Sequence, residues 1–248
     1  MGSSPVTSEM ISDDPTHIGS GPCAPDPSTY QDALDIIARY GVRAPATVLA
    51  HLERGMRGEI AETPKPEDRL FQRVENRVIA TAQDSLQAAA ACFRAQGITP
   101  VILGDSVTGE ASEVAKVYGA LTRQIRSHGE PFKPPLALIS GGECTVTVRG
   151  AGRGGRCSEF LLSLALELDG MPNVYALACD TDGIDGSEDN AGAVLAPDSL
   201  ARAAVTGLSA KKLLANNDGY SFFEALKDLV LTGPTRTNVN DYRAILML

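Results

Sequence analysis

The chain has 248 residues, of which 43% are hydrophobic and 21% charged, and its formal net charge is -9. This length suffices for one large α/β domain or two smaller ones with a buried core. The acidic balance leaves no basic stripe for a phosphate backbone, which argues against a nucleic-acid partner. No apolar run approaches the roughly 20 residues that span a bilayer, and no signal-peptide pattern opens the chain. We therefore expect a cytoplasmic protein without a membrane partner.

The first quarter of the chain predicts short helices between loops. Residues 1–30 are rich in Ser, Gly, Pro and Asp, which is typical of turns. The apolar spacing in residues 29–40 predicts an amphipathic helix, and residues 46–54 predict a second one. Residues 57–69 are charged and contain two prolines, so we interpret them as a linker.

From about Val74 onward, predicted strands alternate with predicted helices. This alternation favours a mainly parallel or mixed sheet with helices on both faces. Ligands in such sheets bind beyond the carboxyl ends of strands. The loops after Ser140, Arg149 and Asp180 are therefore expected to carry the chemistry. The expected strands are 78–82, 100–104, 136–140, 144–149, 174–179 and 242–248, and the expected helices are 85–96, 110–127, 158–168, 199–205, 210–215 and 221–227.

A glycine-rich loop, residues 141–156, follows the predicted strand 136–140 and contains six glycines and three arginines. Glycines let backbone N–H groups approach an anion, and Arg153 and Arg156 can form bidentate contacts with phosphate or carboxylate. The positive end of the helix predicted to follow Arg156 would point to the same place. The loop is therefore a candidate anion site, and the alternative is a mobile surface loop with solvated arginines.

The same loop also matches a dinucleotide-binding spacing. Gly150, Gly152 and Gly155 follow a strand and open a helix, and Asp180 ends the next strand. Arginines interrupt the turn, and the preceding strand directly follows another strand instead of opening a βαβ unit. The pattern alone leaves a nicotinamide cofactor open.

Carboxylates gather in residues 179–189, directly after a predicted strand. Asp182 and Asp185 suit Mg²⁺ bound through one or two ligands plus substrate phosphates, or a base for a hydroxyl. The spacing resembles a calcium loop, but Ile184 stands where that loop needs glycine. The structural alternative is a turn held by its own backbone hydrogen bonds.

The hydroxyl and amide groups of residues 232–241 could bind a polyhydroxy ligand, although by chemistry alone a structural turn is the better interpretation. The five cysteines are isolated and the three histidines show no metal-ligand spacing, which fits free thiols in a reducing compartment. Only Cys157, near a helix start and Arg156, would favour the thiolate; we treat it as a bystander.

Residues 136–156, 181–186 and 232–241, taken together in this order, resemble the MOFRL region of type-2 glycerate kinases, whose relatives are often named hydroxypyruvate reductase. Residues 12–15 and 20–22 resemble the stretch before the linker in that family. The resemblance implies two α/β domains with the site in the cleft between them, and phosphorylation of D-glycerate at its 2-hydroxyl with ATP and Mg²⁺.

The resemblance also assigns roles to residues of this chain. Arg156 would contact phosphate or the substrate carboxylate, and Asp182 would lie near the reacting hydroxyl or bind the metal. Glu9 stands where the family usually has an aspartate. The remaining candidates for substrate or nucleotide binding are Glu143, Gly152, Arg153, Gly154, Gly155, Asp185, Thr235, Thr237, Asn238 and Asn240.

By this resemblance, residues 1–68 are the remnant of an N-terminal Rossmann-like domain plus linker, and residues 69–248 form a MOFRL-like α/β domain. Family members carry a longer N-terminal part with an active-site lysine that no residue here replaces, so we expect this chain alone to have low or no kinase activity. The expected partners are glycerate and ATP, and a homo-oligomer is left open. The alternatives are an NAD(P)H-dependent hydroxypyruvate reductase and a non-catalytic ligand-binding module.

Overall fold

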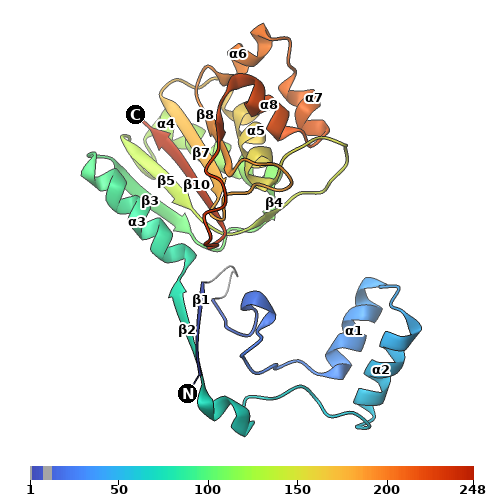
Figure 1. Ribbon diagram of the computed structural model, residues 1–248. Coiled ribbons are helices and arrows are strands. Elements are labelled where there is room, and N and C mark those ends of the chain that lie inside the picture. The colour runs from blue at the N-terminus through green and yellow to red at the C-terminus, as the bar shows by residue number, and fades with distance from the viewer. Residues whose placement is uncertain (1, 8–12) are drawn as a thin grey trace. The chain divides into compact units, whose positions relative to one another are not determined.

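The computed structural model describes residues 2–7 and 13–248 (Figure 1). The chain divides into two compact units, one built mainly from residues 13–79 and the other from residues 80–248. Each unit is described by itself. The prediction that residues 1–68 form the remnant of a first domain stays a prediction.

The first unit contains two helices that pack on each other. A capping box starts α1 (Tyr30–Tyr40), because Thr29 and Asp32 satisfy each other's backbone N–H groups. In α2 (Ala46–Met56), Gly55 is packed against Tyr30, where an added Cβ would lie 2.3 Å from the ring. Both predicted helices are confirmed.

The strand predicted at residues 78–82 begins and ends earlier, as β2 (Val74–Ala80), and it joins no large sheet. Its partner is β1 (Gly2–Thr7), in a two-stranded pair. Two 3₁₀ turns complete the unit, at Ile18–Ser20 and Arg69–Arg73. The described part of this unit has no other strand, so the Rossmann-like remnant is not confirmed.

A six-stranded mixed sheet forms the centre of the second unit, as expected for the fold class. Only its β3–β5 pair is parallel, because the final strand β10 lies between β5 and β7 and runs antiparallel to both. The alternation of strands and helices along the sequence therefore does not mean that neighbouring strands of the sheet are parallel. In spatial order the strands are β3 (Thr99–Gly104), β5 (Leu136–Ser140), β10 (Asp241–Met247), β7 (Val174–Asp180), β8 (Gly192–Leu195) and β9 (Leu229–Val230).

The two faces of this sheet are covered unequally. Alternate residues of β5 point to opposite faces: Leu136 and Leu138 join the larger core with α4 (Ala111–His128) and α5 (Arg156–Leu168), whereas Ala137 and Ile139 pack with α3 (Ala82–Ala95). The short helices α6 (Ser199–Val205), α7 (Ala210–Ala215) and α8 (Gly219–Leu226) lie near α5 (Figure 1). None of the described helices is long and apolar enough to cross a membrane.

The strand predicted at residues 144–149 is much shorter than expected. Only Cys144–Thr145 pairs, as β6, with β4 (Gly109–Glu110). The Glu110 carboxylate accepts hydrogen bonds from the Thr147 N–H at 2.9 Å and the Thr147 hydroxyl at 3.0 Å. A side chain thus takes the donor that a longer strand would have used, and the chain continues as a loop toward α5.

Candidate functional site

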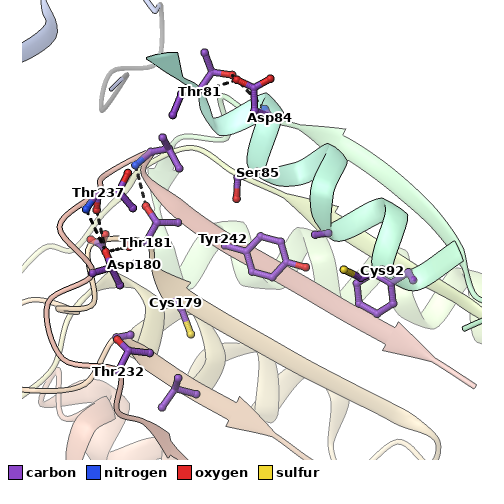
Figure 2. Close-up of a pocket in the computed structure, with 17 residues that line it drawn as sticks. Thr81, Asp84, Ser85, Cys92, Cys179, Asp180, Thr181, Thr232, Thr237 and Tyr242 are labelled. Atoms are coloured by element: carbon purple, nitrogen blue, oxygen red, sulfur yellow. Dashed lines mark hydrogen bonds between the residues drawn. The ribbon is translucent and has the colours of Figure 1, made fainter. Parts of the chain in front are cut away.

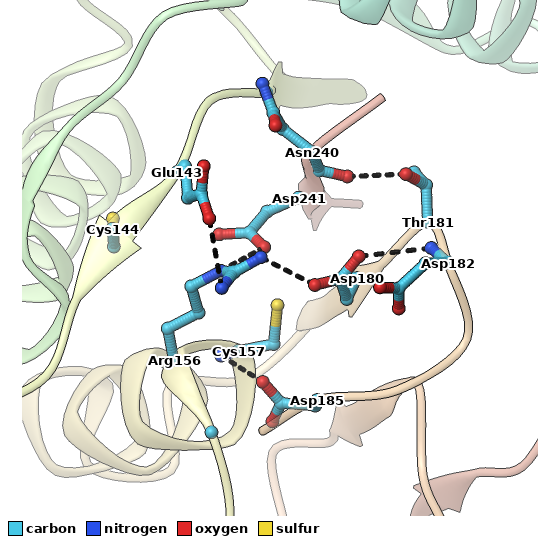
Figure 3. Close-up of polar contacts among 12 residues, drawn as sticks. Glu143, Cys144, Arg156, Cys157, Asp180, Thr181, Asp182, Asp185, Asn240 and Asp241 are labelled. Carbon is cyan, nitrogen blue, oxygen red and sulfur yellow. Dashed lines mark hydrogen bonds and ion pairs between the residues drawn. The ribbon is translucent and has the colours of Figure 1, made fainter. Parts of the chain in front are cut away.

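Three carboxylates surround the guanidinium of Arg156, the first residue of α5 (Figure 3). Arg156 Nε lies 2.8 Å from Asp241 Oδ1, Nη2 lies 2.6 Å from Asp180 Oδ2, and Nη1 lies 3.2 Å from Glu143 Oε1. Asp180 ends β7, Asp241 begins β10, and the two are direct cross-strand partners. The sheet thus brings the predicted residues Arg156 and Glu143 together at the edge where strands β3, β5 and β7 end.

A second guanidinium, that of Arg243, shares Asp241 with the first and is only 1% exposed. It pairs with the other carboxylate oxygen of Asp241 and donates to the Gly141 carbonyl at 3.0 Å. Asp241 therefore bridges two arginines. Sequence reasoning missed both Asp241 and Arg243, although a charged residue at an inward-facing position of an apolar strand could have indicated them.

Burial and the neighbouring charges shift the pKa values of the groups in this network. Burial opposes the charged form of Arg156, but Asp241, Asp180 and Glu143 outweigh it and raise the pKa of the guanidinium. Burial raises the pKa of Asp180 to about 7, although the neighbouring Arg156 acts in the opposite direction. Arg156 therefore stays positively charged at any physiological pH.

The start of α5 is occupied by the protein's own carboxylate. Asp185 is fully buried and accepts hydrogen bonds from the backbone N–H groups of Cys157 at 2.9 Å and Ser158 at 2.8 Å. This contact neutralises the helix end that we expected to attract an external anion. Burial also raises the pKa of the Cys157 thiol well above its usual range, so the expectation of a thiolate is wrong.

The glycine-rich loop is held in place by the connection between α7 and α8. The Asn217 side-chain oxygen accepts from the N–H groups of Arg149 at 2.7 Å and Gly150 at 3.1 Å, and the Asn216 carbonyl accepts from Gly152 N–H at 2.9 Å. A Cβ at Gly152 would lie 2.5 Å from that carbonyl oxygen. These glycines thus permit close packing within the protein, and the N–H groups are not free for an anion in this conformation.

The other predicted site residues lie in different surroundings. Arg153 pairs with Glu224 of α8 at 2.9 Å and lies over the Tyr220 ring at 4.5 Å. It also pairs with Glu188, in the loop between β7 and β8, at 3.5 Å. Gly154 and Gly155 line the same cavity as Arg156. Glu9 is outside the described residues.

The segment before β10 is tied to the loop that follows β7. Thr235 N–H donates to the Asp182 carbonyl at 2.9 Å, and its hydroxyl donates to the Thr181 carbonyl at 2.6 Å. The Asn238 side chain accepts from the N–H of Asn240. Asn240 is buried, and its side-chain amide nitrogen has no partner within the described part of the chain. Thr235 and Thr237 face a second cavity.

Arg156 opens onto a cavity of about 440 Å³, which we call the arginine cavity. Glu143, Gly152, Glu159 and Asn217 also line it. Burial raises the pKa of Glu159, partly offset by its hydrogen bond from Asn217. Within residues 13–248 no group of three or more His, Cys, Asp or Glu side chains could hold a metal ion.

Replacing Asn217 with alanine should loosen the glycine-rich loop. The change removes the acceptor of two backbone N–H groups, which costs about 1–3 kcal/mol of unfolding free energy. Amide hydrogen exchange at Arg149 and Gly150 should accelerate at the same time. Asn173→Ala is the matched control, because Asn173 has a similar positive φ of 60 but its side chain makes no described hydrogen bond. Equal exchange at Arg149 in both variants would contradict the assigned role of Asn217.

Known proteins resemble this chain along nearly its whole length. The MOFRL family model matches residues 136–241, and the model of a domain of unknown function, DUF4147, matches residues 3–53. "Putative hydroxypyruvate reductase" of Agrobacterium vitis is 46% identical over 98% of this chain and 54% of its own length. Glycerate kinase of Macaca fascicularis is 30% identical over 95% of this chain and 69% of its own length.

A solved structure shares the fold. The crystal structure of glycerate kinase from Thermotoga maritima matches with a TM-score of 0.84 and 33% identity, over 99% of this chain and 57% of that one. This chain thus spans little more than half the length of several of its relatives. With both family models, the relatives and the solved fold in agreement, the chain belongs to the type-2 glycerate kinase family.

Proposed function

We propose that this chain takes part in the ATP-dependent phosphorylation of D-glycerate at its 2-hydroxyl. The main support is Arg156, which lies at the wall of a polar cavity in a chain of the glycerate kinase family. Its carboxylate partners hold the guanidinium in place and keep it positively charged. Phosphoryl transfer depends on positioning and on neutralising negative charge, and little covalent chemistry is asked of the protein. A fixed guanidinium supplies such charge.

The three carboxylates around Arg156 are not equivalent. The side chains of Asp180 and Asp241 are 4% and 0% exposed, whereas that of Glu143 is 41% exposed. The buried carboxylates of Asp180 and Asp241 hold the guanidinium. Nη1 faces Glu143, whose exposed side chain can be displaced. In our proposal the carboxylate of glycerate or a transferring phosphoryl group displaces Glu143 from Nη1 and takes up a charge-assisted hydrogen bond there.

Asp182 fits the role of a single Mg²⁺ ligand. One of its oxygens accepts from the Ile184 N–H at 2.8 Å, and the other has no partner among the described residues. Mg²⁺ in phosphoryl-transfer sites commonly takes one or two carboxylates, with substrate phosphates and water completing its shell. The ion supplies charge neutralisation for the phosphates, and Asp182 would anchor it.

The reductase alternative has the name of the Agrobacterium vitis relative in its favour. Against it, the N–H groups of Arg149, Gly150 and Gly152 donate within the protein, so the dinucleotide-like spacing leaves them unavailable to a pyrophosphate. Phosphoryl transfer is therefore the better supported function.

A ligand panel with this chain tests the proposal. Thermal unfolding is measured with D-glycerate, ATP–Mg²⁺ and NADH, and turnover is followed by ³¹P NMR, which separates 2-phosphoglycerate from 3-phosphoglycerate. We expect stabilisation by glycerate and ATP–Mg²⁺, none by NADH, and 2-phosphoglycerate formed at the low rate expected of this chain alone. Binding without turnover would favour a non-catalytic module, and NADH oxidation with hydroxypyruvate would favour the reductase; either result overturns the proposal.

A further inference from the structure

A cavity of about 740 Å³ lies on the face of the large sheet that α3 covers (Figure 2). We call it the α3 cavity. Its body is apolar: Ala89 and Phe93 of α3 line it together with Val230, Val239 and Tyr242. Its volume falls within the range of about 300–1,000 Å³ that is typical of small-molecule sites. An apolar cavity with an aromatic ring in its lining suits a flat aromatic ligand.

Polar groups gather at one end of the α3 cavity. Thr181 and Thr237 lie there beside the end of β7, and Asp84 lies at the start of α3 (Figure 2). The Thr181 hydroxyl donates to the Asn240 carbonyl at 2.7 Å and accepts from Val239 N–H at 2.9 Å. One oxygen of Asp84 is bonded to Thr81, and the other is available as an acceptor. The cavity is thus apolar in its body and rich in hydroxyl partners at one end.

The polar end of the α3 cavity adjoins the arginine network. Asp180 lines the α3 cavity, and its carboxylate is bonded to Arg156, which lines the arginine cavity. The ion pair between Asp180 and Arg156 therefore links the lining of the α3 cavity to the lining of the arginine cavity. A ligand whose apolar part fills the α3 cavity would direct its polar part toward Arg156.

We propose that the α3 cavity binds the nucleoside portion of the phosphoryl donor, with the base in the apolar body and the ribose at the Thr181, Thr237 and Asp84 end. This assignment rests on the proposed function, since it takes the donor to be a nucleotide. A purine nucleoside has the required asymmetry: a flat, weakly polar base joined to a sugar with hydroxyl donors. The phosphates that follow the ribose would then lie on the Arg156 side.

One exposed thiol in the α3 cavity and one that does not line it allow a test that does not depend on turnover. Cys92 is exposed and lines the cavity, whereas Cys23 is exposed and lies outside it. The chain is alkylated with iodoacetamide alone, with adenosine, with ADP or with ATP–Mg²⁺, and labelling of each cysteine is followed by peptide mass spectrometry. At a concentration near nine times Kd, the bound fraction predicts about tenfold slower labelling of Cys92. Labelling of Cys23 should not change.

A matched pair of α3 variants locates the bound nucleoside. Ala89→Phe adds a ring inside the cavity, whereas Ala88→Phe adds the same ring at an exposed neighbouring position. We expect the first variant to weaken adenosine binding at least tenfold and the second to leave it unchanged. If Ala89→Phe fails to fold, Thr237→Val removes one hydroxyl at the exposed polar end and should weaken adenosine without affecting an apolar probe.

The outcomes separate this inference from the proposed function. Turnover or calorimetric binding of ATP without protection of Cys92 overturns the inference and leaves the kinase function standing. Protection of Cys92 by adenosine without any phosphorylation of glycerate supports the inference and overturns the function. Protection by an apolar dye but not by adenosine also overturns the inference.

Discussion

Arg156→Ala should lower the free energy of unfolding by about 3 kcal/mol, because breaking a buried charge pair leaves its partners uncompensated. Asp180 and Asp241 are both buried and would lose their shared cation, and Asp241 would keep only Arg243. In the proposed function the same change removes the charge that binds substrate, so binding of D-glycerate should be lost as well.

Arg153→Ala is the internal control, since both arginines belong to the same loop. Its side chain is 46% exposed and pairs with carboxylates at the surface. Such pairs contribute about 0–1 kcal/mol, so the control should unfold nearly as the parent chain does. Urea unfolding at neutral pH compares the two variants. Equal destabilisation by both would show that the carboxylates around Arg156 are solvated, and the assigned network would be wrong.

Asp241→Ala should destabilise the protein by about 3–5 kcal/mol, because it leaves a buried cation without its partner. The side chain of Asp241 is fully buried and that of Arg243 is 1% exposed. Arg243 has no other carboxylate within ion-pair distance among the described residues. Because the guanidinium is buried, water cannot readily replace the lost carboxylate. Asp241→Asn keeps one acceptor oxygen and should cost less.

Two comparisons isolate the contribution of Asp241. Asp198 pairs with Arg202, but its side chain is 65% exposed, so Asp198→Ala should change stability by only about 0–1 kcal/mol. The double variant Arg156→Ala with Asp241→Ala should cost less than the sum of the single changes, since the two residues share one interaction. Strict additivity in urea unfolding would mean that Arg156 and Asp241 do not interact.

Cys179 should react slowly with alkylating reagents. Burial, together with the acidic neighbours Asp185 and Asp180, raises the pKa of its thiol to about 12. Because only the thiolate reacts, labelling at pH 8 should be slower than at the exposed Cys23 by about tenfold or more. Between pH 9 and 12 the folded chain retains a proton that the unfolded chain releases, so stability should fall as pH rises through that range. Equal labelling of the two thiols would contradict this.

The local sequence pattern predicted most helices and strands, but it did not predict which strands pair in the sheet. The strand Leu136–Ser140, apolar except for its last residue, and the leucine-rich α5 could be placed from the local sequence alone, because elements that are buried on all sides are apolar at nearly every position. The position of β10 between β5 and β7 could not, because strand partners are chosen by contacts between residues distant in sequence. The core carboxylate Asp241 was missed for the same reason.

The glycine-rich loop shows a different limit of sequence reasoning. Its glycines predicted a close approach, and the structure contains one, but the approaching group is the Asn216 carbonyl and not a ligand. The glycines in the sequence indicate that another group approaches the backbone closely, but they do not identify that group. Arg156 was predicted because an arginine in a glycine-rich loop before a helix can bind an anion. Its three carboxylate partners come from three segments that are distant from it in the sequence.

The central place of β10 has a consequence for how the protein is made. The strand that joins β5 to β7 comes about a hundred residues after β5 in the chain, so during synthesis the facing edges of both strands wait unpaired until it leaves the ribosome. Open strand edges are where nascent chains associate wrongly. The same late strand brings Asp241 to Arg156, so the sheet and the charge network are completed together. A ribosome-bound chain in which β10 has not yet emerged should need a chaperone to remain soluble.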